Sequence, residues 1–218
     1  MRALALLVDA DDTLWENAVY FEEAIEQFVD FLDHSALTPA EVRQVLDEIE
    51  IGNIGVHGYG SKSFARNLRI CFENLAERHY TQADLDRVVA LGEAILDRPI
   101  ELIEGVAETL EYLAERHRLT LFTKGHGEEQ LAKLDRSSLG HRFRAARVVR
   151  EKDARAYREV VEAEGWRRER TWMIGNSPKS DIRPALEVGL GAVLVPHERT
   201  WALELDDVPE PRPAVVGG

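Results

Sequence analysis

The chain has 218 residues, 44% of them hydrophobic and 31% charged, and its 40 acidic and 27 basic residues give a formal net charge of −13. This composition excludes a disordered or fibrous chain, and the acidic balance argues against nucleic acid and anionic membranes as partners and favours small molecules. The single cysteine, Cys71, excludes an intramolecular disulfide, and no apolar run approaches the ~20 residues of a membrane span, so we expect a cytoplasmic protein.

A short apolar run at residues 4–8 is typical of a strand buried on both faces. The residues that follow it instead carry helical periodicity, in segments at 21–34, 38–50, 61–79 and 81–96. Thr38, which precedes a proline, and Thr81 are typical residues for helix starts. Because a single crossover helix needs a much shorter stretch, this pattern predicts a separate helical domain over residues 16–97.

From residue 98 onward, apolar runs alternate with amphipathic segments. We expect strands at 119–123, 171–175 and 192–196, with a weaker candidate at 144–149. We expect helices at 105–117, 128–135, 153–164 and 179–188. This rhythm predicts an α/β fold with a doubly wound parallel sheet, built from residues 1–15 and 98–218. The segment after Pro196 has no clear periodicity and ends in a proline-rich tail at 208–218, to which no role is assigned.

Three acids, Asp9, Asp11 and Asp12, follow the first predicted strand. Ligands of open parallel sheets bind beyond the carboxyl ends of the strands, so this is an expected place for function. If the backbone stays extended, Asp9 and Asp11 project to the same side, where two like charges need a proton or a cation such as Mg²⁺ between them. The alternative is that these acids cap the helix that follows, and their spacing alone does not decide between the two.

Two other site types are excluded by the residues present. A calcium loop of the EF-hand type starting at Asp9 needs glycine and glutamate where the chain has Leu14 and Tyr20. The glycine-rich stretch at 55–63 departs from a phosphate-binding loop, because its lysine falls one position late and no buried strand precedes it. The seven histidines show no paired ligand spacing, which argues against a catalytic zinc.

Polar residues also follow the other predicted strands. Thr123 ends one strand, Lys152 follows the weak strand, and Asn176 and Asp181 follow the strand at 171–175. In such a set one carboxylate can attack phosphorus, a lysine and a metal can offset the charge of the phosphate, and a second carboxylate can transfer a proton. The combination indicates phosphoryl transfer.

The ordered set "DADDTL", Thr123, Lys152 and "GNSPKSDI" resembles the four motifs of the haloacid dehalogenase superfamily of hydrolases. The helical insert resembles that superfamily's cap of the first type, and the resemblance implies a Rossmann-like core. It implies that Asp9 is the nucleophile, that Asp11 is the general acid and base, and that Thr123 and Lys152 position the phosphate and the nucleophile. It also implies a Mg²⁺ ion held by Asp9, the backbone carbonyl of Asp11 and the fourth motif.

Two departures from that pattern refine the expectation. The fourth motif usually begins with Gly-Asp, and here it is Gly175-Asn176, so either Asn176 or Asp181 is the metal ligand from this loop. The superfamily's dehalogenases lack the second acid, whereas this chain keeps Asp11. The resemblance therefore implies hydrolysis of small phosphate monoesters, with a phosphomutase or a dehalogenase as alternatives. A receiver-like phosphoacceptor module is the alternative from another class, although receivers carry the phosphorylated aspartate on a middle strand and lack such an insert.

Several further residues have two open interpretations. Lys124, beside Thr123, either reaches phosphate or lies on the surface. His57 and Lys62 fall in a glycine-containing segment at 52–63, which predicts a flexible cap loop that reads a small phosphorylated metabolite, or else simple turns. Asp12 is expected to be a capping or solvated acid, and Cys71 to lie in a core. The oligomeric state is open.

Overall fold

The computed structural model describes residues 3–207 and 214–215. The chain divides into two compact units, one formed by Met1–Ala18 with Ile100–Gly218 and the other by Val19–Pro99. The sequence places this division after residues 15 and 97. Most of the proline-rich tail lies outside the described residues. Within the described ranges, no helix is long and apolar enough to cross a membrane.

The first unit is an α/β unit with a six-stranded sheet in the order β3-β2-β1-β4-β5-β6. The strands are β1 (Ala5–Val8), β2 (Arg118–Lys124), β3 (Ala145–Val149), β4 (Thr171–Gly175), β5 (Gly191–Leu194) and β6 (Ala214–Val215). Every neighbouring pair is parallel. The chain runs outward from β1 to β3 and then continues on the other side of β1 with β4. The crevice beyond the carboxyl ends of β1 and β4 is therefore the switch point where a ligand is expected.

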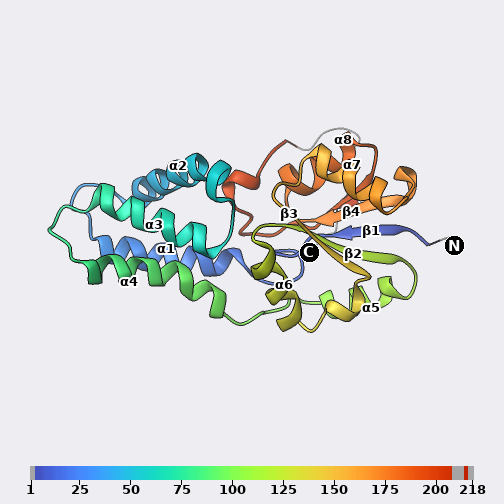
Figure 1. Cartoon of the computed structure of the whole chain (residues 1–218), viewed down its shortest axis with the longest axis horizontal. Coiled ribbons are helices and arrows are strands. Elements are labelled where there is room, and N and C mark those ends of the chain that lie inside the picture. Colours follow the sequence, from blue (N-terminus) through green and yellow to red (C-terminus); the bar gives the residue numbers. More distant parts are fainter. Residues whose placement is uncertain (1–2, 208–213, 216–218) are drawn as a thin grey trace. The chain divides into compact units, whose positions relative to one another are not determined.

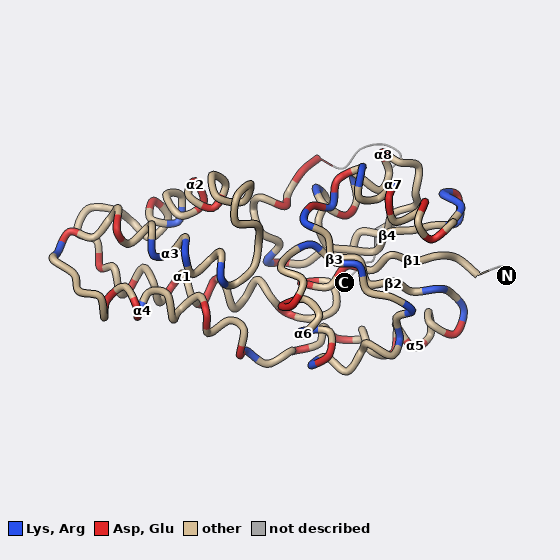
Figure 2. The backbone as a smooth tube through the Cα atoms, viewed as in Figure 1, with Lys and Arg blue, Asp and Glu red and all other residues tan. Residues whose placement is uncertain are grey.

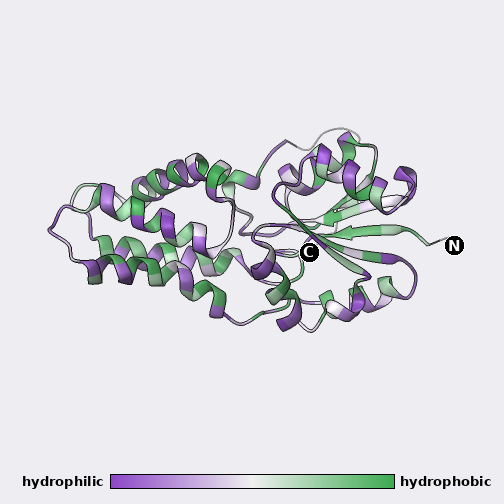
Figure 3. Cartoon of the chain, in the orientation of Figure 1, coloured by the Kyte–Doolittle hydropathy of each residue, from purple (hydrophilic) through white to green (hydrophobic). Residues whose placement is uncertain are grey.

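Helices cover both faces of this sheet, as Figure 1 shows. They are α5 (Val106–Ala114), α6 (Gly127–Arg136), α7 (Ala154–Ala163) and α8 (Arg183–Glu187). Alternate residues of β1 pack on opposite sides, Leu6 with α5 and α6, and Leu7 with α7 and α8. Burial of each such side chain stabilises the fold by about 1.5–3 kcal/mol. The predicted doubly wound sheet is confirmed, and the apolar character of its central strands is visible in Figure 3.

The helix predicted at 179–188 is not regular along its length. It begins as a π-helical turn at Pro178–Ile182 and continues as α8. The wider turn is explained by Pro184, which has no N–H and whose ring clashes with the carbonyl of residue 180 in a regular helix. The freed carbonyl of Ser180 instead accepts a hydrogen bond from Tyr157 Oη at 3.0 Å. This turn carries Asp181.

The second unit is built from four helices: α1 (Ala18–Leu32), α2 (Pro39–His57), α3 (Ser61–Leu75) and α4 (Gln82–Glu93). Their apolar faces form one core that includes Cys71, which is fully buried as predicted, and burial raises the pKa of its thiol to about 12. Thr38 and Thr81 both begin helices through capping boxes, with Glu41 and Asp84 as the returning acids. Such caps contribute about 1 kcal/mol each.

The segment at 52–63 had two interpretations, a flexible cap loop or simple turn glycines, and the flexible loop is wrong for most of its length. Helix α2 continues to His57, and α3 begins at Ser61. The side chain of Asn53 donates a hydrogen bond to Asn67 Oδ1 on α3 at 2.8 Å, which supports the last turns of α2 despite the cost of about 1 kcal/mol for each glycine inside a helix. The chain turns only where Gly58 and Gly60 take φ angles of +69° and +110°.

Acidic and basic residues are interspersed along both units, as Figure 2 shows.

Glu50 on α2 is an acid whose charged form is disfavoured in the folded protein. Burial raises its pKa to about 7, the charge of Arg43 acts to lower it, and the charges of Asp47 and Glu22 raise it further. The folded protein therefore keeps the Glu50 proton at pH values where the unfolded chain has lost it. Between about pH 4.5 and 7 this group makes the protein less stable as the pH rises.

We expect the substitution Glu50→Gln to raise the free energy of unfolding by about 2 kcal/mol at pH 8 and to change it little at pH 4, because glutamine has no charge to bury. Urea unfolding at the two pH values measures the difference. Glu48→Gln, on the exposed side of the same helix, is the matched control and should shift stability by less than about 0.5 kcal/mol at either pH. An equal gain at both pH values would contradict the titration argument.

Candidate active site

The central strand β1 delivers Asp9 to the switch point of the sheet. Asp9 directly follows the strand, and its backbone N–H donates to the carbonyl of Ile174 on β4 at 2.9 Å. Its side chain lies among neighbours, with the whole residue only 6% exposed. The buried run of β1 thus places one carboxylate at the edge where the ends of β1 and β4 meet.

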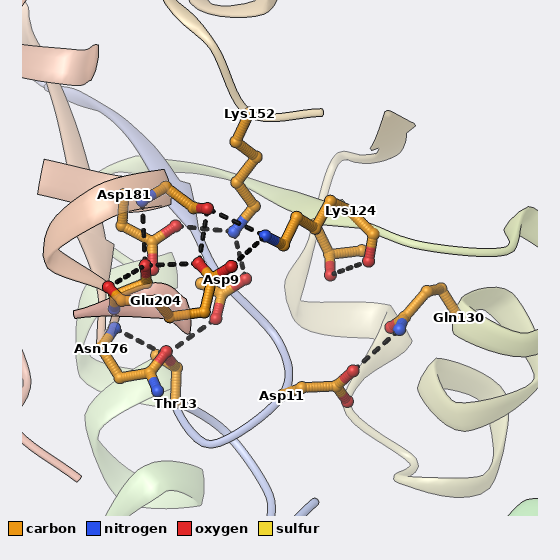
Figure 4. Close-up of polar contacts among 12 residues, drawn as sticks. Asp9, Asp11, Thr13, Lys124, Gln130, Lys152, Asn176, Asp181 and Glu204 are labelled. Atoms are coloured by element: carbon orange, nitrogen blue, oxygen red, sulfur yellow. Dashed lines mark hydrogen bonds and ion pairs between the residues drawn. The ribbon is translucent and has the colours of Figure 1, made fainter. Parts of the chain in front are cut away.

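Lys152 connects Asp9 to a second buried carboxylate, that of Asp181. The ammonium of Lys152 donates to Asp9 Oδ1 and, at 2.6 Å, to Asp181 Oδ1. Burial raises the pKa of Asp181, and the charge of Asp9 adds to this, whereas the two carboxylates together raise the pKa of Lys152 against the effect of its own burial. The cluster therefore holds two carboxylates for one ammonium (Figure 4).

The loop after β4 is fitted closely around Asp181. The backbone N–H of Ser177 donates to Asp181 Oδ2 at 3.0 Å. A Cβ atom added to Gly175 would lie 2.3 Å from the same oxygen, so glycine is required for this close approach.

Thr13 links this loop to Asp9. Its Oγ1 lies 3.0 Å from Asp9 Oδ2 and 3.3 Å from Asn176 Oδ1, and accepts a hydrogen bond from the backbone N–H of Asn176 at 3.1 Å. Asp9, Lys152, Asn176 and Asp181 therefore meet at one edge of the sheet. The sequence pattern gave no role to Thr13, although it belongs to the motif "DADDTL".

Asp11 does not share the orientation of Asp9. The chain turns after Asp9, and the carboxylate of Asp11 accepts hydrogen bonds from Trp15 Nε1 at 2.8 Å, Gln130 Nε2 at 2.8 Å and Lys133 Nζ at 3.0 and 3.1 Å. Figure 4 shows it separate from the Asp9 cluster, beside Gln130. The expectation that both carboxylates project to the same side is wrong in this arrangement, because the backbone does not stay extended.

The surroundings of Asp11 also keep it ionised. Burial acts to raise its pKa, but the Lys133 charge and the hydrogen bonds from Gln130 and Trp15 outweigh burial and lower it. Gln130 and Lys133 are three apart and share one face of α6, but the sequence does not indicate that this face meets Asp11. The role of Asp11 in proton transfer stays a prediction, and it requires release from Lys133.

Asp12 is a capping acid, as one of its two interpretations predicted. Its Oδ1 accepts hydrogen bonds from the backbone N–H groups of Asn17 and Ala18, both at 2.9 Å, at the start of α1. It is buried rather than solvated, and burial raises its pKa to about 6. Asp12, Glu16 and His197 also bring one possible ligand atom each to within 4.8 Å of one another. Of these atoms, Asp12 Oδ1 is already occupied in capping α1.

Thr123 and Lys124 lie at the carboxyl end of β2, the strand beside β1. Thr123 is 1% exposed. The ammonium of Lys124 donates to Ser180 Oγ at 3.0 Å and pairs with the carboxylate of Glu204, so Lys124 is not a plain surface lysine. Glu204 comes from the segment after Pro196, where no periodicity marked it as a site residue.

His57 and Lys62 belong to the helical unit, at the end of α2 and the beginning of α3. The ring of His57 lies within hydrogen-bond distance of Arg66, at 2.9 Å from its Nη1. Their part in reading a substrate stays a prediction.

A family model and a solved structure both relate this chain to the haloacid dehalogenase-like hydrolases. A sequence model of the haloacid dehalogenase-like hydrolases matches residues 4–189. The solved structure of a haloacid dehalogenase-like family hydrolase from Xanthomonas campestris is 32% identical, with a TM-score of 0.84, and the match covers 96% of this chain and 87% of that one. No curated protein matches the chain.

Two more distant structures share the fold. A magnesium-bound HAD-hydrolase from Bacillus subtilis is 18% identical, with a TM-score of 0.68 over 99% of this chain and 94% of that one. A 2-haloacid dehalogenase from Pseudomonas syringae is 20% identical, with a TM-score of 0.63, and the match covers 99% of this chain and 94% of that one.

Proposed function

This chain belongs to the haloacid dehalogenase-like hydrolases, and on that premise we propose that it hydrolyses phosphate monoesters of small metabolites with the help of Mg²⁺. The observation that carries the proposal is the buried cluster of Asp9, Lys152 and Asp181 at the switch point of the sheet. Membership of a hydrolase family sets aside a receiver-like signalling module.

In the proposed reaction Asp9 is the nucleophile. Asp11 must first leave Lys133 and take up a proton from solvent. One carboxylate oxygen of Asp9 then forms a bond to phosphorus, the ester P–O bond breaks, and the leaving alkoxide takes the proton from Asp11. In the second step water attacks phosphorus and gives a proton to Asp11, while the bond between phosphorus and the Asp9 oxygen breaks. Inorganic phosphate leaves, Asp9 is again a carboxylate, and Asp11 is again a carboxylic acid. Lys152 holds Asp9 in place and offsets charge, and the buried Thr123 is proposed to orient the phosphate.

The residues at this edge fit Mg²⁺. The available donors are carboxylate and amide oxygens from Asp9, Asp181 and Asn176, and hard cations prefer oxygen ligands. The family resemblance adds the main-chain carbonyl of Asp11 to this proposed set. Asp9 and Asp181 share one ammonium, and their mutual repulsion helps to raise the pKa of Asp181, so a cation between them would relieve that repulsion. When bound, the ion neutralises charge on the phosphate group.

We expect Asp181→Asn to weaken Mg²⁺ binding by about tenfold or more, because it removes one anionic ligand, whereas Asn176→Asp should tighten binding because it adds one. Calorimetric titration of Mg²⁺ into the purified proteins measures both affinities without any need for turnover. If Asn176→Asp leaves the affinity unchanged while Asp181→Asn abolishes binding, Asp181 is the ligand and Asn176 serves only to shape the loop.

The proposed function is tested with a panel of phosphorylated small metabolites, scored by released phosphate with Mg²⁺ and with a chelator. A parallel panel of 2-haloacids, scored by released halide, tests the dehalogenase alternative. Phosphate release that depends on Mg²⁺ supports the proposal. Halide release without phosphate release would replace it, and interconversion of phosphate isomers without net release would indicate a mutase.

A further inference from the structure

Glu204 forms the centre of a buried polar network beside the proposed phosphate site. It lies at the end of a 3₁₀ turn, Ala202–Glu204, and is 9% exposed. Its Oε1 pairs with Lys124 Nζ, and its Oε2 accepts hydrogen bonds from Ser177 Oγ at 2.7 Å and Ser180 Oγ at 2.5 Å. One carboxylate thus holds the ends of two segments that come from β2 and β4, as seen in Figure 4.

The partners of Glu204 are neighbours in sequence of the proposed catalytic residues. Lys124 directly follows Thr123, and Ser177 directly follows Asn176. Ser177 also donates its backbone N–H to Asp181, which bonds to Lys152. Glu204 is therefore connected to the Asp9 cluster through a short chain of hydrogen bonds.

The charges of this network oppose the entry of an anion. Glu204 is ionised: burial acts to raise its pKa, but the charge and hydrogen bond of Lys124 and the serine hydroxyls lower it overall. A phosphate oxygen that approached Lys124 Nζ would come close to the Glu204 carboxylate, at a largely buried place where like charges are poorly screened. The Glu204 carboxylate and a phosphate group therefore compete for the ammonium of Lys124.

We propose that Glu204 is an exchangeable counter-ion of Lys124, which neutralises this ammonium in the empty site and yields it to the phosphate group of the substrate. The inference rests on the proposed phosphatase function. It assigns Glu204 as a positioning residue that weakens the binding of anions through Lys124, so that the substrate and the inorganic phosphate product are held less tightly and phosphate is released more readily.

The test is a double-mutant cycle on the full chain, with Glu204→Gln, Lys124→Met and the variant that carries both. Calorimetry with inorganic phosphate in the presence of Mg²⁺ gives the affinity of each protein. Glu204→Gln should bind phosphate about tenfold more tightly than wild type, because the amide keeps a similar shape but loses the competing charge. Lys124→Met should bind phosphate more weakly, and in that background Glu204→Gln should have no further effect.

Asp206→Asn is the matched control. Asp206 lies two residues beyond Glu204 and pairs with Arg183, so this variant loosens the same segment without changing the charge beside Lys124. It should leave phosphate affinity unchanged. Should Glu204→Gln fold poorly in thermal unfolding, Glu204→Asp keeps the charge but shortens its reach, and it should tighten phosphate binding by a smaller factor.

Unchanged or weaker phosphate binding by Glu204→Gln would overturn the inference, and so would an equal gain in the Lys124→Met background or in Asp206→Asn. The proposed function is judged separately by release of phosphate from esters. If wild type hydrolyses esters but Glu204→Gln does not tighten phosphate binding, the proposed function holds and the counter-ion inference fails. If Glu204→Gln tightens phosphate binding but no ester is hydrolysed, the counter-ion inference holds and the proposed function fails. If neither wild type nor Glu204→Gln binds phosphate, the counter-ion inference is overturned, while release of phosphate from esters still decides the proposed function.

Discussion

Asp9→Asn should abolish phosphate release, with a loss of at least about 10³-fold, because an amide cannot attack phosphorus and form the acyl phosphate. The substitution nearly preserves the shape of the side chain, and the Asn carbonyl oxygen can still accept the hydrogen bond that Thr13 offers. The variant is therefore expected to fold. Continuous phosphate assays on the best substrate of the panel measure the loss, and circular dichroism with thermal unfolding confirms that the protein is intact. Appreciable turnover by the folded variant would refute the nucleophile assignment.

Asp11→Asn is the matched comparison, since it removes the neighbouring carboxylate and leaves Asp9 unchanged. Its loss should depend on the leaving group: an alkyl ester needs a proton from Asp11, whereas an aryl ester needs less help. Burst-phase phosphate release from both kinds of ester separates the two cases. Equal losses on both would count against proton transfer by Asp11.

Lys152→Met should lower the free energy of unfolding by about 3–5 kcal/mol in the absence of metal, because it leaves the carboxylates of Asp9 and Asp181 buried without their shared cation. Both carboxylates are nearly inaccessible to water, with side-chain exposures of 8% and 0%. Urea unfolding at neutral pH measures the change. Mg²⁺ should restore part of the stability, since a cation that binds only the folded state shifts the equilibrium toward it.

Lys179→Met is the control for this experiment. Lys179 is exposed and donates to the backbone carbonyl of Leu203, so its removal should change stability by less than about 0.5 kcal/mol. A small effect of Lys152→Met, similar to that of Lys179→Met, would show that the buried cluster does not depend on its ammonium.

The sheet could be predicted from the sequence for a simple physical reason. Parallel strands buried on both faces read as continuous apolar runs, and the carboxyl ends of such strands meet at one edge. That rule places Asp9, Lys152 and Asp181 at the same edge of the sheet, although they are separated by up to 172 positions in the chain.

The details of the site that could not be predicted depend on contacts between distant segments. The orientation of Asp11 is set by Lys133 on α6, and local spacing around residue 11 contains no information about that contact. Glu204 is one acid among 40 and lies in a segment without periodicity. The helical course of α2 through Gly52 and Gly55 also escaped prediction, because local propensity favours a loop there and the bond between Asn53 and Asn67 supplies tertiary support.

The contact between Gly175 and Asp181 limits how this protein can be redesigned. The space left for a side chain at position 175 is already filled by the Asp181 carboxyl group, so even alanine there would displace a residue of the buried cluster. Glycine has no reactive group, and yet this position is as constrained as the acids around it. Engineering for new substrates is better directed at residues whose side chains have room to change, and position 175 should be held fixed in any library of variants.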